Sequence, residues 1–245
     1  MPHSEYIREV PGSREAVLMI HGILGTPRHF DVFLPLVPES WSVYSILLDG
    51  HGGRVEGFSH TSMKKWKAQV ARWLDVLLSR YDRIIIVAHS MGTLFAIQEA
   101  VERPEKISHL FLLQTPLRPW PKLRYLMYAA VLPFGITPKG AETMKSDCSI
   151  TLTPWLWKYI GWIPRFLELF AQCSSTRKLL PRLTVPCQVY QSRHDELVSM
   201  RSCIDLKKHP HIHMTVLPNS GHFGHTGEDL KFLKAAFSKL FEASQ

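Results

Sequence analysis

The chain of 245 residues has few cysteines and no long apolar run. Its four cysteines form no C-x-x-C pair and have no adjacent histidine at metal-ligand spacing, so we expect free thiols rather than disulfides or zinc ligands. The purest apolar run, Ile84 to Ala88, has the length of a strand and falls far short of the roughly 18 residues that cross a bilayer. The first residues lack the basic start and apolar stretch of a secretory signal, so the expected location is the cytoplasm.

The overall composition is that of an ordinary globular protein, with 45% apolar and 20% charged residues and no internal repeat. The net charge of +8 is unevenly distributed. Between Pro116 and Pro181 nine basic residues stand against three acidic ones, and the same stretch holds four of the seven tryptophans. This segment therefore differs from the rest of the chain, and the positive charge permits attraction to acidic lipids, acidic substrates or nucleic acid.

Short apolar runs alternate with amphipathic stretches on both sides of that segment. Strands are expected at residues 16–20, 43–48, 83–88, 107–113, 185–191 and 212–217, and helices at 64–80, 91–101, 200–208 and 228–241. This alternation predicts an α/β fold, with a mainly parallel central sheet covered by helices on both faces. We expect residues 1–115 and 182–245 to form the core and residues 116–181 to form a mostly helical cap, or lid, inserted after the strand at 107–113.

A serine stands where the strand at 83–88 passes into a helix. The sequence Ala88-His89-Ser90-Met91-Gly92 has small residues two positions before and after Ser90, as a nucleophile elbow requires. The helix that begins at Met91 directs its free N–H groups and the positive end of its dipole toward this serine. The alternative is that Ser90 only caps the helix, since serine is a favoured N-cap residue.

A glycine-containing turn follows the first strand and suits the stabilisation of an oxyanion. In His21-Gly22-Ile23-Leu24-Gly25 the two glycines allow backbone N–H groups to face outward at the end of the strand. The N–H groups of Ile23 and Met91 are the candidate oxyanion-hole donors. The alternative is an ordinary glycine-rich turn.

A candidate acid and a candidate base come later in the chain, each just after a strand. Asp195 follows the strand at 185–191 and His222 follows the strand at 212–217. Ser90, Asp195 and His222 therefore occur in the order expected for a Ser-Asp-His triad at one edge of such a sheet. The nearest rivals are Glu196 for the acid and His225 for the base.

These motifs resemble those of the α/β-hydrolase superfamily over nearly the whole chain, and small bacterial carboxylesterases and monoacylglycerol lipases in particular. The matching stretches are His21 to Gly25, Asp49 to Gly52, His89 to Gly92, Asp195 with Val198, and Gly221-His222. The sequence departs from the usual elbow at Ala88, where glycine is usual, and at Thr93, where a further glycine is common. The resemblance also implies a cap inserted in the region of 116–181.

The expected activity is the hydrolysis of carboxylic esters, with acyl-glycerols or other lipid-like esters as substrates and no cofactor or metal. His209, His211 and His213 alternate along the chain, but no cysteine or acidic ligand supports a metal site there. The aromatic and basic composition of the cap predicts a substrate with an apolar acyl group and transient contact with an anionic membrane surface, whereas no motif indicates nucleic-acid binding. An acyl thioesterase and a non-catalytic lipid-binding protein of hydrolase fold remain alternatives.

Overall fold

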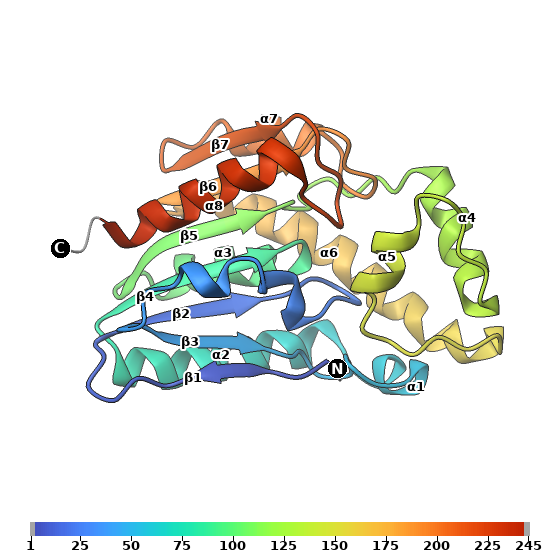
Figure 1. Ribbon diagram of the computed structural model, residues 1–245, viewed down its shortest axis with the longest axis horizontal. Coiled ribbons are helices and arrows are strands. Elements are labelled where there is room, and N and C mark those ends of the chain that lie inside the picture. The colour runs from blue at the N-terminus through green and yellow to red at the C-terminus, as the bar shows by residue number, and fades with distance from the viewer. Residues whose placement is uncertain (1–2, 243–245) are drawn as a thin grey trace.

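A computed structural model describes residues 3–242. Seven strands form one sheet in the order β1-β3-β2-β4-β5-β6-β7, in which only β1 is antiparallel to its neighbour (Figure 1). The strands are β1 (Tyr6–Arg8), β2 (Glu15–Ile20), β3 (Ser42–Ile46), β4 (Arg83–His89), β5 (Ile107–Leu113), β6 (Cys187–Ser192) and β7 (Ile212–Leu217). The mainly parallel sheet predicted from the sequence is confirmed.

Helices flank this sheet and fill the segment between β5 and β6. The α-helices are α1 (Val55–Ser59), α2 (Met63–Arg80), α3 (Met91–Glu102), α4 (Leu123–Val131), α5 (Glu142–Asp147), α6 (Ile163–Leu179), α7 (Arg201–Leu206) and α8 (Gly227–Glu242). Short 3₁₀ turns are η1 (Pro27–Phe30), η2 (Leu34–Leu36), η3 (Leu132–Phe134), η4 (Leu156–Trp162) and η5 (Leu180–Arg182).

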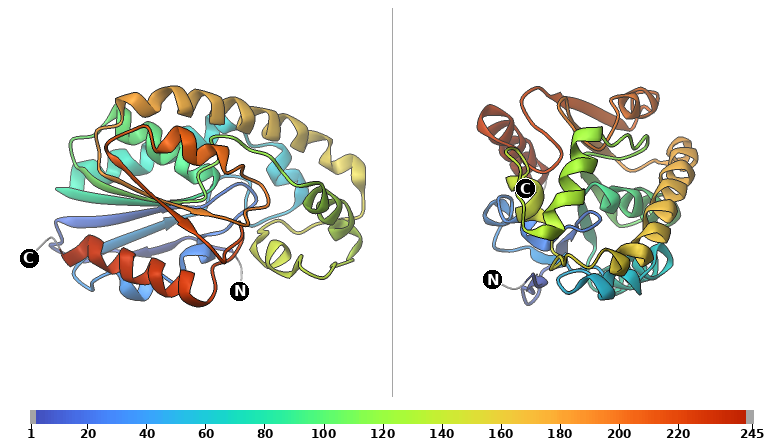
Figure 2. Two further views of the ribbon diagram at one scale, coloured as in Figure 1. Left: turned by 90° about the horizontal axis from the view of Figure 1, so that it is seen from above. Right: turned by 90° about the vertical axis from the view of Figure 1, so that its right-hand side faces the viewer.

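The sheet is apolar on both faces because a helical layer covers each of them. Along β4, Ile84 and Ile86 face the cluster that contains residues of α2, α3 and α6, whereas Ile85 and Val87 face the cluster that contains α8. Figure 2 shows α8 on one side of the sheet and α2, α3 and α6 on the other. Strand β4 pairs with β2 and β5, so the chain that leaves it emerges at the centre of the carboxyl edge.

Two predicted strand boundaries differ from the structure by two residues, other ends of the predicted strands differ by at most one, and one strand was not predicted. The strand predicted at 185–191 begins at Cys187, because Pro186 has no N–H to donate to a neighbouring strand. Strand β3 ends at Ile46 rather than continuing to Leu48. The short edge strand β1 pairs with β3 through three residues only.

The segment between β5 and β6, which we call the inserted segment (residues 116–181), is mostly helical. Helices α4 and α5 lie beyond the carboxyl ends of the strands (Figure 1). Helix α6 returns along the sheet and contacts α3, and it buries Leu169 and Cys173 in the same core cluster as α2. Helix α4 has no buried residue. Within the inserted segment, α6 therefore packs into the core, whereas α4 does not.

Candidate active site

Ser90 occupies a sharp, strained turn between β4 and α3. Its backbone has φ 50° and ψ −123°, a conformation that residues other than glycine rarely adopt. Its side chain makes no capping hydrogen bond to α3, so the geometry does not support the alternative that it is only an N-cap. The turn depends on Gly92, because a Cβ atom there would lie 2.2 Å from the carbonyl oxygen of Ile20 in β2.

The two departures from the usual elbow pattern, Ala88 and Thr93, are both buried beside this turn. The side chain of Ala88 is fully buried in the core beside β2. Thr93 is also buried, and its hydroxyl donates a 2.7 Å hydrogen bond to the carbonyl oxygen of Ser90. Threonine at this position therefore stabilises the turn that carries Ser90.

The structure brings Ser90, His222 and Asp195 together at the carboxyl edge of the sheet. Nε2 of His222 lies 3.1 Å from Oγ of Ser90, and Nδ1 lies 2.9 Å from Oδ2 of Asp195. Because a carboxylate only accepts hydrogen bonds, Nδ1 carries the proton and Nε2 is left to accept the proton of the serine hydroxyl. All three residues are buried, so water screens these contacts little.

The carboxylate of Asp195 is fixed by its own loop. Its Oδ1 accepts hydrogen bonds of 2.8 Å and 2.7 Å from the backbone N–H groups of Leu197 and Val198, and the Gln191 amide lies 3.3 Å from Oδ2. These donors hold the carboxylate plane in a fixed orientation toward the imidazole. Val198, three positions after Asp195, therefore helps to orient this carboxylate through its backbone N–H.

The rival acid and base occupy different positions. The Glu196 carboxylate accepts hydrogen bonds from the backbone N–H of His222 and from the hydroxyl of Tyr125, whereas the ring nitrogens of His222 bond to Asp195 and Ser90. His225 is partly buried, and within residues 3–242 neither of its ring nitrogens has a hydrogen-bond partner. Burial lowers the pKa of His225 to about 4, so its imidazole is neutral near pH 7.

Two buried histidines shape the turn at residues 21–25. The ring of His21 donates to the carbonyl of Gly22 and accepts from the N–H of Leu48, at 2.8 Å and 3.0 Å. The ring of His51 accepts a 3.1 Å hydrogen bond from the N–H of Leu24, whose φ is 58°. Both rings accept through one nitrogen, which requires the neutral form, and burial lowers both pKa values.

The two candidate oxyanion donors are available for hydrogen bonding. Within residues 3–242 the N–H of Ile23 donates to no acceptor. The N–H of Met91 is at the first position of α3, where a helix supplies no acceptor. Gly22 allows this turn to lie against the elbow, because a Cβ there would lie 2.8 Å from Cβ of Ser90. The turn after β2 and the start of α3 therefore lie close together around the serine.

A group of neutral histidines and one partly buried carboxylate adjoin the site. His89 stacks on His29 with ring centres 3.8 Å apart, and its Nε2 donates to the carbonyl of His222. Burial lowers the pKa of His29 to about 3. Asp147, at the end of α5, lies 3.9 Å from Nδ1 of His29, and burial raises the pKa of this carboxyl to about 6. The inserted segment thus places a titratable acid beside the histidines.

The described residues contain no group of three or more histidine, cysteine or acidic side chains arranged to hold a metal ion. Of the three alternating histidines only His213 lies in β7; the other two precede it in the loop. All four cysteines are free thiols, and burial raises the pKa of Cys173 to about 12. No helix in the described part of the chain is long and apolar enough to cross a membrane.

Sequence reasoning missed the contacts of Glu196 and the position of Asp147. Glu196 was considered only as a rival to Asp195. Its contact with Tyr125 could not be foreseen, because the two residues are 71 positions apart in the sequence. Asp147 gave no signal, since it lies in the inserted segment among ordinary polar residues. Both depend on where α4 and α5 lie, which no local pattern specifies.

Comparison with known proteins fits this geometry. Residues 17–234 match the alpha/beta hydrolase family. The chain belongs to this family. A solved structure from the metagenome-derived lipolytic enzymes LipS and LipT is 20% identical, with a TM-score of 0.75 and coverage of 98% of both chains. A monoacylglycerol lipase of Paleococcus ferrophilus is 18% identical, with a TM-score of 0.70 and 98% coverage of both chains.

Other proteins that are similar to this chain carry different names. A thioesterase domain from the curacin biosynthetic pathway is 20% identical, with a TM-score of 0.62, and the match covers 98% of this chain and 99% of that one. A curated relative in Cupriavidus necator, the dihydrolipoyllysine-residue acetyltransferase component of an acetoin cleaving system, is 30% identical over 96 residues. That match spans 39% of this chain and only a quarter of the relative's length. At these identities the solved structures establish the fold alone.

Proposed function

We propose that this protein is a serine hydrolase that cleaves carboxylic esters through an acyl-enzyme intermediate. The observation that carries the proposal is the position of His222, with one ring nitrogen 3.1 Å from Oγ of Ser90 and the other 2.9 Å from the Asp195 carboxylate. A serine hydroxyl is a weak nucleophile until an adjacent base accepts its proton. This arrangement supplies that base, oriented by an acid.

In the first half of the reaction Oγ of Ser90 attacks the ester carbonyl carbon while its proton passes to Nε2 of His222. The tetrahedral oxyanion accepts hydrogen bonds from the N–H groups of Ile23 and Met91. The bond to the alcohol oxygen then breaks, and His222 returns the proton to the leaving alcohol. Asp195 keeps the ring in the required tautomer and stabilises the imidazolium.

In the second half a water molecule attacks the acyl-enzyme and gives its proton to His222. The bond to Oγ breaks, the proton returns to Ser90, and the carboxylic acid is released. One ester and one water thus yield one alcohol and one acid. Every proton transfer in this sequence uses side chains of this chain.

The preference for apolar acyl groups is supported by the inserted segment. Helix α4 exposes Leu123, Leu126 and Met127, which share one helical face, and α6 exposes Ile163 and Leu167. Exposed apolar side chains in such number indicate an apolar ligand or surface. We therefore favour acyl-glycerols or other lipid-like esters as the substrate class.

We also infer that the inserted segment contacts an anionic lipid surface. Trp155 and Trp157 are adjacent and exposed, by 53% and 62%, in a segment with nine basic and three acidic residues. Tryptophan prefers the boundary between water and lipid, and basic residues are attracted to anionic headgroups. Charge and apolar surface together favour a membrane over a protein partner.

The test is steady-state hydrolysis of p-nitrophenyl esters of increasing acyl length by the parent protein and by Ser90→Ala and His222→Ala. The proposal predicts turnover by the parent, an optimum above the two-carbon ester, and losses of at least about a thousandfold in both variants. A folded parent protein that hydrolyses no ester in the series overturns the proposal and favours a non-catalytic binding role.

A further inference from the structure

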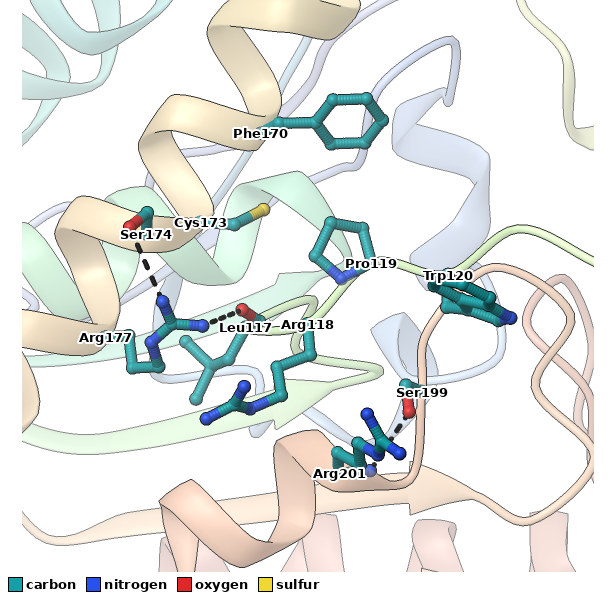
Figure 3. A pocket seen from close by; sticks show the side chains of 10 residues that line it. All are labelled: Leu117, Arg118, Pro119, Trp120, Phe170, Cys173, Ser174, Arg177, Ser199 and Arg201. Atoms are coloured by element: carbon teal, nitrogen blue, oxygen red, sulfur yellow. Dashed lines mark hydrogen bonds between the residues drawn. The ribbon is translucent and has the colours of Figure 1, made fainter.

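A pocket of about 760 Å³ lies between the inserted segment and the start of α7, where the chain leaving β5 passes α6 (Figure 3). Arginines from three separate parts of the sequence line it: Arg118 after β5, Arg177 in α6 and Arg201 at the start of α7. Phe170 and Trp120 form the opposite side in Figure 3. The pocket thus combines guanidinium groups with aromatic side chains.

The arginines are only partly neutralised by neighbouring acids. Arg118 forms a two-pronged ion pair with Asp205, at 2.7 Å and 3.2 Å. The guanidinium of Arg177 donates to the carbonyl of Leu117, at 3.3 Å, and not to a carboxylate. Within residues 3–242 neither Arg177 nor Arg201 forms an ion pair. One carboxylate facing three guanidinium groups leaves an excess of positive charge.

This pocket is separate from Ser90 and His222 but adjoins the loop of the candidate acid. Pro119 and Val198 form an isolated antiparallel bridge, and the N–H of Val198 donates to Asp195. The N–H of Trp120 donates to the carbonyl of Leu197 in the same loop. A ligand group held by the arginines would therefore lie outside the reacting centre, beside the loop that carries Asp195.

The chemistry of the pocket favours a phosphate over a single carboxylate. Guanidinium groups bind phosphate through paired hydrogen bonds, and several of them together match a group that carries more than one negative charge. Trp120 is 74% exposed and offers a flat apolar surface beside the charges. The carboxylate of a fatty acid carries only one negative charge and would neutralise only part of this excess of positive charge.

We propose that the pocket binds a phosphate carried on the leaving group of the acyl substrate. The inference rests on the proposed hydrolysis and narrows its substrate class to phosphorylated acyl esters or thioesters. The phosphate holds the distant end of the leaving group while the acyl carbonyl lies at Ser90. Binding energy from such a remote group raises the rate when it helps to position the reacting bond.

Two matched substrate pairs test the proposal and separate its two sources of phosphate. Palmitoyl-coenzyme A is compared with palmitoyl-pantetheine, which has the same thioester without phosphate, and lysophosphatidic acid is compared with monoacylglycerol. The readout is the ratio of kcat/KM for the phosphorylated member to that for its neutral partner. We expect Arg177→Ala and Arg201→Ala each to lower this ratio roughly tenfold or more in one pair. That pair then identifies a coenzyme or a lipid headgroup as the source.

Lys178→Ala is the matched control, because Lys178 is an exposed basic residue next to Arg177 that does not line the pocket. We expect this variant to keep the parent ratio in both pairs. Arg201→Ala guards against misfolding, since its side chain is exposed. A ratio that neither arginine substitution changes in either pair overturns the proposal.

A binding measurement keeps this inference distinct from the proposed catalysis. Calorimetry with the Ser90→Ala protein measures the affinity for coenzyme A and for glycerol 3-phosphate, without any turnover. We expect at least one of the two to bind, and Arg177→Ala in that background to weaken its binding roughly tenfold or more. Failure of the parent to hydrolyse any ester would then leave the phosphate site supported, whereas absence of binding to both compounds overturns it.

Discussion

The carboxylate of Glu196 accepts a 2.6 Å hydrogen bond from the backbone N–H of His222. Its other oxygen accepts a 2.8 Å hydrogen bond from the hydroxyl of Tyr125 in α4. One side chain therefore joins the loop of the candidate base to a helix of the inserted segment. Glu196 positions the backbone of His222, whereas its neighbour Asp195 orients the ring.

The first prediction compares the two adjacent acids through equal-sized substitutions. Asp195→Asn should lower kcat by on the order of a thousandfold or more, because an amide no longer fixes the tautomer of His222. Glu196→Gln should lower it less than about tenfold, because the new amide oxygen still accepts from the backbone N–H of His222 and the amide nitrogen can donate to the hydroxyl of Tyr125, which reverses the direction of that hydrogen bond. Equal losses, or the larger loss in Glu196→Gln, would show that the acids have been assigned wrongly.

The second prediction concerns the close approach of α3 to β2. Gly92→Ala should lower the free energy of unfolding by about 3 kcal/mol or more, because the new Cβ would overlap the carbonyl oxygen of Ile20. Gly53→Ala is the control, since a Cβ there meets no atom within 4 Å. Urea denaturation measures both, and similar stability of the two variants would contradict the close contact.

The third prediction is a pH dependence of stability caused by Asp147. Burial raises the pKa of this carboxyl from 3.8 to about 6, so the folded state binds the proton more tightly than the unfolded state. The stabilising contribution is therefore complete at low pH and is lost as the pH rises through about 6.

The effect of Asp147→Asn on the free energy of unfolding should consequently be more favourable at high pH than at low pH. Relative to the parent, its free energy of unfolding should increase by about 1–3 kcal/mol between pH 4 and pH 8. Urea denaturation at a series of pH values measures the difference. A difference that is constant across this range would rule out the raised pKa.

The fourth prediction tests the membrane contact of the inserted segment. Trp157→Ser should weaken association with phosphatidylglycerol vesicles roughly tenfold, because it removes a large apolar group from the surface. The control is Val76→Ser, which removes an exposed apolar side chain from α2, outside the inserted segment. Sedimentation with phosphatidylglycerol and phosphatidylcholine vesicles is the measurement. Equal binding to both lipids, or an equal effect of both substitutions, would argue against this surface.

Much of the fold could be predicted because the core strands are continuous apolar runs with clear ends. The strands at 107–113 and 212–217 have the predicted bounds, and α2 and α3 begin within one residue of those expected. The edge strand β1 was missed because Tyr6 and Ile7 are exposed and its three residues give no apolar pattern. Pairing with β3, rather than local sequence, specifies this strand.

The proximity of Ser90, Asp195 and His222 could be anticipated for a physical reason. Each follows a strand, and the carboxyl ends of parallel strands meet at one edge of the sheet. The arginine pocket has no such rule behind it, since Arg118, Arg177 and Arg201 come from a loop and two helices. Its existence depends on the path of the inserted segment, which only the three-dimensional arrangement reveals.

The most direct measurement is labelling of the protein with a fluorophosphonate, followed by mass spectrometry of the labelled peptide. The account predicts stoichiometric modification of Ser90, abolished in Ser90→Ala and strongly slowed in His222→Ala, because only a serine with a functioning base reacts rapidly. Absence of labelling in the folded parent protein, or modification of a different serine, would contradict the proposed role of Ser90.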